Sequence, residues 1–502
     1  MCSQNQKRSW KNFNMSHTRR FQPKDVFALG FLLGVALLLR LYHITAPVAD
    51  WHSWRQVDTA AVARNFVEGD FDLMHPKFDD FSNVQTGKYN PEGLRFVEFP
   101  LYNASFALLY KVAPVVTLEV YGRIVTIFFS LMTLISIYYL LYHEVSRPSA
   151  FWGGMIYAVM PFFVYFSRVI LPDPIAVGCI FISIMCMYRW THETHKPTTI
   201  ALYVLGIIFA SLAILIKPTA IFYFLPLLYL FFRKYTFRSI VRWDVYVFFI
   251  LAVIPFGLWR YWISLFPVGG PGFEWLITSV NTFEGQKIIF MRPAFFRWVF
   301  YERILILIMG GWTSGFLLLG SLRKLARPWL LYSLSASALI YIFTFQGGNV
   351  QHDYYQIIIL PVLALVAGMG IGFLYDFHER FIPRVGITII VIGVIAFSWI
   401  MSYERVKDMY AINGGLINNA RIIKTLTPKD ALVVTDTTGD TTLLYNAHRK
   451  GMPTFADALP ELKKRGMQYF ATSNTGAIED IQKNHPEFEK IFSNTDITLY
   501  KL

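Results

Sequence analysis

Charged residues are scarce in this sequence. Asp, Glu, Lys and Arg make up 16% of its 502 residues and 55% are hydrophobic, whereas an ordinary soluble domain has about 25% charged residues. This scarcity excludes a single soluble globular domain. Long apolar stretches separated by short polar turns predict instead a protein that crosses a membrane several times.

Cysteine is almost absent. The three cysteines are Cys2, Cys179 and Cys186, and the last two lie in one apolar stretch. Their number and spacing exclude a disulfide framework and a zinc site of the usual kind, so redox chemistry is not expected. The sequence also has no internal repeat and no low-complexity tract.

The formal net charge is +13, which by itself would fit a nucleic-acid-binding protein. Lys and Arg, however, gather in short turns between apolar stretches, as the positive-inside rule expects. We interpret the charge as a sign of membrane topology and expect no nucleic-acid partner. Residues 1–25 form a basic leader, and we expect the apolar run after it to be kept as a first helix rather than cleaved, because Arg40 interrupts it before any small-residue cleavage site.

Apolar windows long enough to cross a bilayer core of about 30 Å recur along the chain. We find eleven, at residues 26–44, 119–142, 149–167, 174–190, 198–216, 219–232, 243–263, 303–321, 329–345, 356–375 and 383–401. Basic residues in the leader and in the turns after the sixth and eighth windows fall on one side if residues 99–116 lie along the outer face without crossing. The fold predicted is a membrane all-α bundle of about 11 to 13 transmembrane helices.

The same alternation gives the domain plan. A cytoplasmic leader (1–25) precedes a membrane domain (26–401), whose outer loop (45–118) carries surface helices, and residues 402–502 form a small extracytoplasmic α/β domain. In this last domain we expect helices near 415–426, 457–465 and 477–484, and strands at 431–435, 467–471, FEKIF and ITLYK. We expect an integral membrane protein, of the bacterial inner or plasma membrane, with a cytoplasmic N-terminus.

The stretch ADWHSWRQVDTAAVARNF, residues 49–66, is unusually rich in ionisable groups. Ser53 and Gln56 have the spacing of a capping box, and Gly69 is a typical C-cap, so residues 54–68 are predicted to form a helix at the membrane surface. Arg55 and Asp58 stand three residues apart on this helix. Alone, they would be an ordinary ion pair on a solvated face.

Other ionisable groups are predicted at the same face of the membrane. Each alone is an ordinary helix-end residue, but carboxylates and a lysine that gather at the outer ends of helices indicate a functional site. Lys217 has no carboxylate within one helical turn, so a lipid phosphate is a fitting partner for it. The remaining members of this group are Asp50, Glu98, Asp173, His352 and Asp353.

An ordered set of motifs between residues 50 and 370 resembles the GT-C superfamily of lipid-linked-sugar glycosyltransferases. The similarity is greatest to the protein O-mannosyltransferases and to the aminoarabinose transferases that modify lipid A. The motifs are DTAAVARNFVEGDF, VEFPLYNASFALLYKV with GRIVTIFFSLMTL, LPDPIAV, LAILIKPTAIFYFLP and DYYQIIILPVLALVAG. The resemblance implies a glycosyltransferase that uses a polyprenyl-phosphate sugar.

The resemblance also implies roles for single residues. The essential first-loop acid corresponds to Asp58 or Asp50, since the family's offset falls on Arg55 between them, and the essential aspartate after the third span corresponds to Asp173. Lys217 matches a lysine near the lipid phosphate. Glu98 matches an acid in a Glu-Lys-Pro-Pro pattern in which this chain has Phe99 in place of the lysine. Further substrate-binding candidates are Arg55, His52, His352, Asp353, Tyr354 and Tyr355.

The expected reaction takes place at the extracytoplasmic face, where nucleotide sugars are absent and the donor must be carried in the membrane. An inverting transfer requires a general base, for which an aspartate is suited, and positive groups that hold the departing phosphate, such as Lys217 with Arg292 or Arg297. The acceptor is a glycan, a lipid or a protein. No cofactor is required, although Asp50, His52, Glu98 and His352 are residue types that bind a divalent metal.

Three alternatives remain at this point. An oligosaccharyltransferase or glycan polymerase with a diphosphate-linked donor fits the same motifs. A transporter or lipid flippase would place its ionisable groups near the bilayer midplane and often has inverted repeats, neither of which is evident here. A binding or scaffold protein would act through its C-terminal domain.

Overall fold

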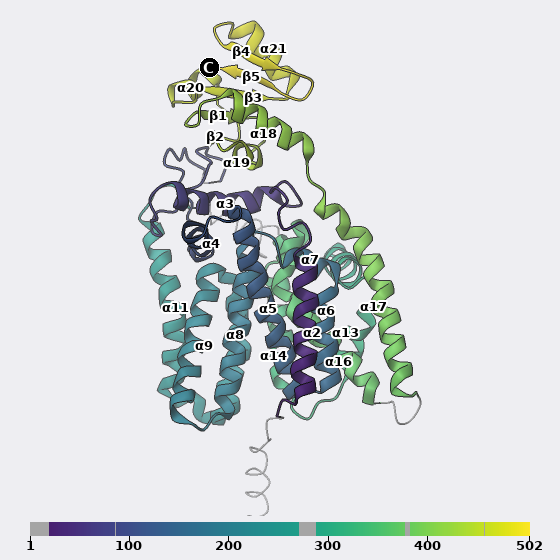
Figure 1. Ribbon diagram of the computed structural model, residues 1–502. Helices are drawn as coiled ribbons and strands as arrows, with labels where there is room; N and C mark the ends of the chain where they lie inside the picture. The colour runs from purple at the N-terminus through teal and green to yellow at the C-terminus, as the bar shows by residue number, and fades with distance from the viewer. Residues whose placement is uncertain (1–19, 86, 271–287, 377–381, 456) are drawn as a thin grey trace, which may run out of the picture.

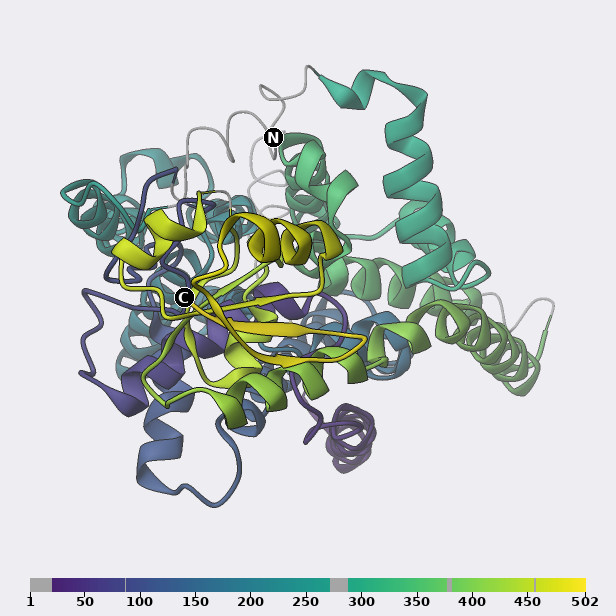
Figure 2. The same cartoon turned by 90° about the horizontal axis from the view of Figure 1, so that it is seen from above.

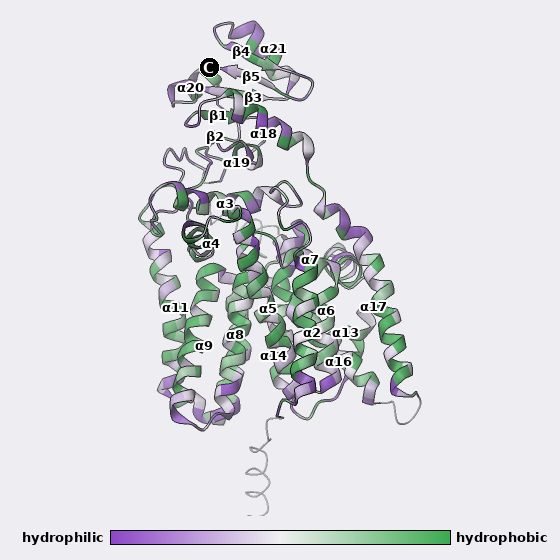
Figure 3. Cartoon of the chain, in the orientation of Figure 1, coloured by the Kyte–Doolittle hydropathy of each residue, from purple (hydrophilic) through white to green (hydrophobic). Residues whose placement is uncertain are grey.

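The computed structural model describes residues 20–85, 87–270, 288–376, 382–455 and 457–502. A body of helices carries a small α/β unit above one of its ends (Figure 1). Apolar residues cover the helices of the body and polar residues gather at its two ends, as expected for a membrane domain (Figure 3). Cys2 and residues 1–19 of the predicted leader lie outside the described residues.

Helices make up the whole of the body. Its first half contains α2 (Pro23–Arg40), α3 (Ser53–Glu68), α4 (Leu101–Val112), α5 (Leu118–Glu144), α6 (Arg147–Val159), α7 (Pro161–Phe166), α8 (Pro172–His192), α9 (Lys196–Ile216), η1 (Pro218–Tyr223), α10 (Phe224–Tyr235), η2 (Thr236–Val241) and α11 (Trp243–Ser264). Its second half contains η4 (Ile289–Met291), α12 (Pro293–Phe296), the π-helix η5 (Arg297–Ile308), α13 (Ser314–Leu322), α14 (Trp329–Thr344), α15 (Gln346–Gln351), η6 (Asp353–Ile359), α16 (Leu360–Asp376), α17 (Arg384–Val406) and η7 (Lys407–Tyr410).

Within the described residues, six helical stretches are long and apolar enough to cross a membrane. They are Leu118–Glu144, Pro172–His192, Lys196–Ile216, Trp243–Ser264, Asp353–Asp376 and Arg384–Leu426. A membrane protein with several apolar helices is therefore confirmed. The finer prediction of 11 to 13 spans stays a prediction.

Several predicted spans are broken into shorter helices. The window 149–167 divides at Met160, which adopts an extended conformation before Pro161 begins α7. A residue that precedes proline is kept out of the helical region, so the chain turns at this point. The window 303–321 likewise divides into η5 and α13.

Small residues let the central helices approach closely. A Cβ atom on Gly370 of α16 would lie 2.0 Å from the carbonyl oxygen of Phe316 in α13, and one on Gly368 would lie 2.6 Å from that of Ser149 in α6. Only glycine permits these distances. Such contacts are typical of helix packing in membranes, where apolar side chains gain little from leaving lipid.

Helix α3 lies across the end of the bundle next to the C-terminal unit, with α4 packed against it (Figure 1). The predicted helix is confirmed, and its C-cap is Gly69 as expected. The predicted capping box is wrong: His52 is the N-cap residue, and the Gln56 amide donates to Asp50 Oδ1 at 2.7 Å instead. The expected solvated face is also wrong, because Arg55 and Asp58 are both buried.

The C-terminal unit is a five-stranded sheet with helices. Its elements are α18 (Gly414–Leu426), β1 (Leu432–Thr435), α19 (Thr442–Ala447), β2 (Lys450–Met452), α20 (Leu459–Lys464), β3 (Tyr469–Thr472), α21 (Thr475–Asn484), β4 (Glu489–Ser493) and β5 (Thr498–Lys501). The strand order is β2-β1-β3-β5-β4, and β1 pairs in parallel with β2 and β3. Every element predicted in this domain is present, whereas α19 and β2 were not predicted.

The C-terminal unit is fastened to the outer loop. Seen from above, it lies over α3 (Figure 2). Arg64 of α3 donates to the carbonyl of Tyr445 at 2.8 Å, and the Tyr445 hydroxyl donates to Glu119 at the start of α5 at 2.6 Å. Asp80 of the outer loop forms a β-bridge with Gly451. The unit is therefore held by contacts with three parts of the membrane domain.

Candidate functional site

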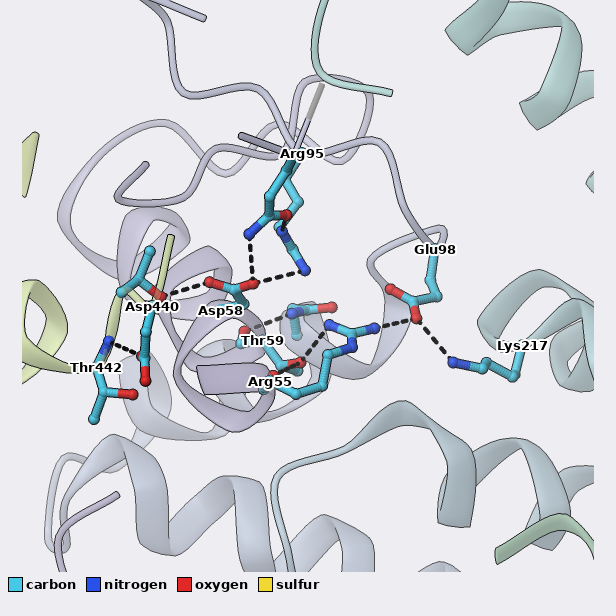
Figure 4. A network of polar contacts seen from close by, with 11 residues as sticks. Arg55, Asp58, Thr59, Arg95, Glu98, Lys217, Asp440 and Thr442 are labelled. Carbon is cyan, nitrogen blue, oxygen red and sulfur yellow. Dashed lines mark hydrogen bonds and ion pairs between the residues drawn. The ribbon is translucent and has the colours of Figure 1, made fainter. Parts of the chain in front are cut away.

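Four charged side chains meet beside α3, at the end of the bundle that lies next to the C-terminal unit. Arg55 donates to Glu98 Oε1, and Lys217 Nζ lies 3.5 Å from the same oxygen and 3.4 Å from Asp173 Oδ2. We call Arg55, Glu98, Asp173 and Lys217 the Lys217 cluster. Figure 4 shows Arg55 and Lys217 reaching Glu98 from opposite sides.

The helices explain why these residues meet. Asp173 is in the first turn of α8, and Lys217 directly follows the last residue of α9. Helices α8 and α9 pack side by side as an antiparallel pair, so the start of one lies next to the end of the other. A carboxylate in a first turn also interacts favourably with the helix dipole. Pro172 and Pro218 mark these two ends.

The Lys217 cluster is buried but balanced, with two cations and two carboxylates. Burial raises the pKa of Glu98, but Arg55, Lys217 and Arg95 outweigh burial and the pKa is lowered. Burial lowers the pKa of Arg55, but Glu98, Tyr354, Asp58 and Asp173 outweigh it and the pKa is raised. Both groups are therefore charged. Removing one charge would leave its partner buried and unpaired, which is costly.

A pocket opens beside the Lys217 cluster on the flank of α3. It is lined by Arg55, Thr59, Arg95, Glu98, Asn103 and Pro172, among others. The other lining residues are Val62, Pro76, Val97 and Pro100, so polar and apolar residues contribute equally, and Arg55 and Arg95 are cations. The two arginines suit a ligand that carries an anionic group.

Asp58 lies on the other flank of α3 and faces the C-terminal domain. Its Oδ2 pairs with Arg95 Nη2 at 3.0 Å and accepts from Gln85 at 3.1 Å, and its Oδ1 accepts from the Thr441 hydroxyl at 2.6 Å. Arg95, Gln85 and Thr441 were not predicted. The charge of Arg95, three residues before Glu98, was a signal that could have identified it, but nothing in the sequence pointed to Thr441.

Asp50 belongs to neither group. Its Oδ1 accepts from Gln56, and its Oδ2 lies 3.5 Å from Nη2 of the buried Arg168. Arg168 was not predicted either. Because its carboxylate is 6% exposed and contacted on both oxygens, Asp50 holds the turn that leads into α3.

The histidine and tyrosine candidates form a ring cluster next to α3. His52 Nε2 lies 2.7 Å from Asp353 Oδ1. The His52 ring packs edge-on against Tyr354, with centroids 5.0 Å apart, and His352 stacks on Tyr354 at 5.3 Å. Tyr355 packs against Tyr354 at 4.8 Å. Burial, followed by the charge of His52, lowers the pKa of His352 to about 4, so this ring is neutral near pH 7.

The cations named from the sequence have different surroundings. No carboxylate lies within one helical turn of Lys217, but Glu98 and Asp173 reach it from elements that are distant in the sequence. Arg297 was expected to help hold a phosphate, but it is exposed and pairs with Glu302. Arg292 is exposed at the start of α12.

Metal-binding residue types do not gather in the part of the chain that is described. No group of three His, Cys, Asp or Glu residues there could hold a metal ion. Asp50, His52, Glu98 and His352 are divided among the Asp50 turn, the ring cluster and the Lys217 cluster.

Known proteins share parts of this chain's sequence and its fold. Residues 98–259 match the family model of dolichyl-phosphate-mannose-protein mannosyltransferases. No curated protein sequence matches the chain. Among solved structures, ArnT from Cupriavidus metallidurans bound to undecaprenyl phosphate is 13% identical, with a TM-score of 0.62 over 94% of this chain and 97% of that chain. The chain has the GT-C fold.

Two further solved structures have a similar fold. The Archaeoglobus fulgidus oligosaccharyltransferase, in complex with Zn and sulfate, is 12% identical, with a TM-score of 0.57 over 89% of this chain and 67% of that chain. The arabinofuranosyltransferase AftD from Mycobacteria is 12% identical, with a TM-score of 0.58 over 97% of this chain but only 42% of that chain. The resemblance to GT-C glycosyltransferases seen in the sequence is confirmed.

Proposed function

We propose that the protein is an integral-membrane glycosyltransferase that moves a sugar from a polyprenyl-phosphate donor to an acceptor hydroxyl. The observation that carries this proposal is the Lys217 cluster, in which two cations and two carboxylates are buried together beside a pocket, at the outer end of a bundle with the GT-C fold. A solved structure with this fold is bound to undecaprenyl phosphate.

Arg55 and Lys217 are the proposed phosphate ligands. In the absence of a donor, Glu98 and Asp173 neutralise their charges. A phosphate that enters the pocket replaces part of this interaction, because its oxygens accept charge-assisted hydrogen bonds from both cations. Arg55 stands at the position where related chains have an acid, so this chain has an additional positive group at the pocket.

Asp173 is the proposed general base. The lowered pKa of Glu98 makes it a weak base. Glu98 pairs with both Arg55 and Lys217, whereas Asp173 pairs directly with Lys217. When Lys217 turns to the phosphate, the Asp173 carboxylate is free to accept the acceptor's hydroxyl proton. The acceptor oxygen then bonds to the anomeric carbon, the bond from that carbon to the phosphate oxygen breaks, and the configuration inverts.

Asp50 and Asp58, the other candidates for the first-loop acid, are proposed to position the site. Donors already contact both oxygens of each carboxylate, and each is buried. Asp50 supports the turn into α3, and Asp58 holds Arg95 at the pocket. His52, His352, Asp353, Tyr354 and Tyr355 are proposed to line the substrate side of the same region.

The donor is tested with variants of Lys217. Lys217→Ala is expected to raise the donor concentration needed for half-maximal transfer at least tenfold, and Lys217→Arg to keep part of the activity. Lys196, exposed at the opposite end of α9, provides the matched control Lys196→Ala. Unchanged donor dependence in Lys217→Ala would mean that Lys217 only extends toward the interface.

A diphosphate-linked donor is the second candidate, because an oligosaccharyltransferase has the same fold. Purified protein in lipid, supplied with polyprenyl-monophosphate and polyprenyl-diphosphate sugars in parallel, distinguishes the two. Chelators added to the same assay test for a divalent metal, and we expect transfer to persist in their presence. A glycan, a lipid or a protein can supply the acceptor hydroxyl.

We further propose that the Lys217 cluster faces the extracytoplasmic side of a bacterial inner membrane, with a cytoplasmic N-terminus. The basic turn near Arg238 supports this orientation. Cysteine in place of exposed Asp70 should react with an impermeant thiol reagent added outside, and cysteine in place of exposed Arg238 should not. Labelling of residue 238 from outside would reverse the orientation.

A further inference from the structure

A second pocket lies at the N-terminal end of α3, away from the pocket beside the Lys217 cluster. Its lining includes Asp50, Trp51, His52, Ser53 and Asp408, and its volume is about 370 Å³. Small-molecule sites usually have volumes of roughly 300–1,000 Å³ and combine aromatic rings with a few polar groups. We call this the Trp51 pocket.

The Trp51 ring is exposed but fixed. Trp51 is 47% exposed. The indole N–H donates to Asp353 Oδ2 at 2.9 Å, and the backbone N–H donates to the carbonyl of Met409 at 3.1 Å. The backbone carbonyl accepts from Tyr165 at 3.1 Å and from Gln56 at 3.0 Å. A ring held in this way loses little further freedom when a ligand packs on it.

These contacts distinguish Trp51 from a tryptophan that anchors a protein in the membrane interface. Such a tryptophan places its apolar ring among lipids and its N–H in the wet headgroup region. Here the N–H is used inside the protein, so only the ring is presented outward. The residue therefore offers a flat apolar surface beside polar groups.

Carboxylates contribute to the lining of this pocket. Asp408 is exposed at its rim, whereas the Asp50 side chain is buried and contacts Gln56 and Arg168. A ligand that packs an apolar face on a ring while its hydroxyls donate to carboxylates has the chemistry of a sugar. An anionic ligand would be repelled by the same carboxylates.

The Trp51 pocket adjoins the proposed reaction site. Trp51 lies in the turn that leads into α3, four residues before Arg55 in the sequence. The rings of His52, Tyr354 and Tyr355 continue from this pocket toward the Lys217 cluster, with neighbouring centroids 5.0 and 4.8 Å apart. A sugar ring on Trp51 would therefore lie within one or two sugar residues of the reacting bond.

We propose that the Trp51 pocket binds a sugar ring of one of the two substrates, with the indole as its platform and Asp408 as a hydroxyl acceptor. This inference rests on the proposed function for the identity of the reaction. Its test is a binding measurement that needs no turnover, so its failure is distinguishable from failure of the proposed transfer.

The experiment is saturation-transfer NMR on the full chain in lipid nanodiscs, with methyl α-mannopyranoside, methyl α-glucopyranoside and methyl α-N-acetylglucosaminide as probes. The wild type should transfer saturation to the ring protons of at least one glycoside. Trp51→Leu should weaken that binding about tenfold, the order expected for loss of an aromatic contact. The matched control is Trp329→Leu, since Trp329 is 65% exposed at the start of α14.

Asp408→Ala provides a second variant at an exposed position, in case Trp51→Leu does not fold, and it should weaken binding several-fold. Equal saturation transfer in the wild type and in either folded variant would overturn the proposal, as would no transfer to any of the three glycosides. In transfer assays, inhibition by the bound glycoside that competes with the lipid donor assigns the ring to the donor. Competition with the acceptor assigns it to the acceptor.

Discussion

Arg55 and Asp58 stand three residues apart on α3, and both end in buried ion pairs, yet the two flanks of this helix differ. Arg55 donates to Glu98 of the loop before α4, and both residues line a pocket. Glu98 in turn pairs with Lys217 at the end of α9. The partners of Asp58 include Thr441 of the C-terminal domain. Ion pairing alone therefore does not mark a catalytic group. The two flanks differ in the parts of the chain that they join, since Arg95, the partner of Asp58, lines the same pocket as Arg55.

The largest effect is expected from Asp173→Asn, on the pocket flank. Loss of the proposed base should lower the kcat of the folded fraction by about 10²–10⁴-fold, the usual range for general base catalysis. The matched control is Asp376→Asn, which changes a half-exposed carboxylate at the opposite end of the bundle. Single-turnover kinetics on purified protein measure the effect. Full activity in Asp173→Asn would transfer the role of base to another carboxylate.

Asp58→Asn should have the opposite profile. Removing the charge leaves Arg95 buried without its close anionic partner, which costs about 3–5 kcal/mol of stability. We expect a clearly lower midpoint of thermal unfolding, with kcat of the folded fraction within about tenfold of the wild type. If transfer is instead abolished at an unchanged midpoint, Asp58 is the base and the comparison between the flanks is reversed.

Much of the membrane face of this site was predictable. Alternating spans place the start of α8 and the end of α9 on one side of the membrane, so Asp173 and Lys217 could be grouped from the sequence alone. Glu98 could be grouped with Asp173 and Lys217 because it lies between two elements that are predicted at the same face of the membrane. Their mutual pairing was not predictable, because it depends on how the loop before α4 folds back toward α9, and that is a matter of tertiary packing.

The contacts of Asp58 on the other flank of α3 could not be predicted from the sequence. Thr441 is 383 residues from Asp58, and threonine next to glycine and aspartate is an ordinary loop residue. The predicted capping box is absent because the Gln56 side chain hydrogen-bonds to Asp50 instead of to the start of the helix. Helix α19 and strand β2 were missed because six and three residues are too few to show a period.

Asp80 lies where the loop after α3 forms a β-bridge with Gly451 of the C-terminal domain. Burial raises its pKa to about 6 from 3.8, and the nearby Asp58 adds to the effect, while bonds from Ser82 and the charge of Arg95 oppose it. A raised pKa means that the folded state holds its proton longer than the unfolded state. The contribution of Asp80 to the free energy of unfolding is therefore complete below about pH 4. It decreases as the pH rises to about 6, by at most about 3 kcal/mol.

Asp80→Asn should remove this dependence. The variant should unfold at a higher temperature than the wild type at pH 7 and at a similar temperature near pH 4. Asp70→Asn, at an exposed position of the same loop, is the control. Midpoints of thermal unfolding in detergent at both pH values measure the difference, and an equal shift at pH 4 and pH 7 would contradict the assignment.

The smallest effect is expected from Thr441→Val, which removes one hydrogen bond to Asp58 and keeps the shape of the side chain. A hydrogen bond to a charged group contributes about 1.5–3 kcal/mol, and here the loss is partly offset because Arg95 and Gln85 still hold the carboxylate. We expect the stability to fall by about 1 kcal/mol. Thr425→Val, in an exposed position of α18, is the matched control. The decisive measurement is a double-mutant cycle with Asp58→Asn: if Thr441 acts through Asp58, the double variant loses less stability than the sum of the single variants, whereas simple addition would separate the C-terminal domain from this flank of α3.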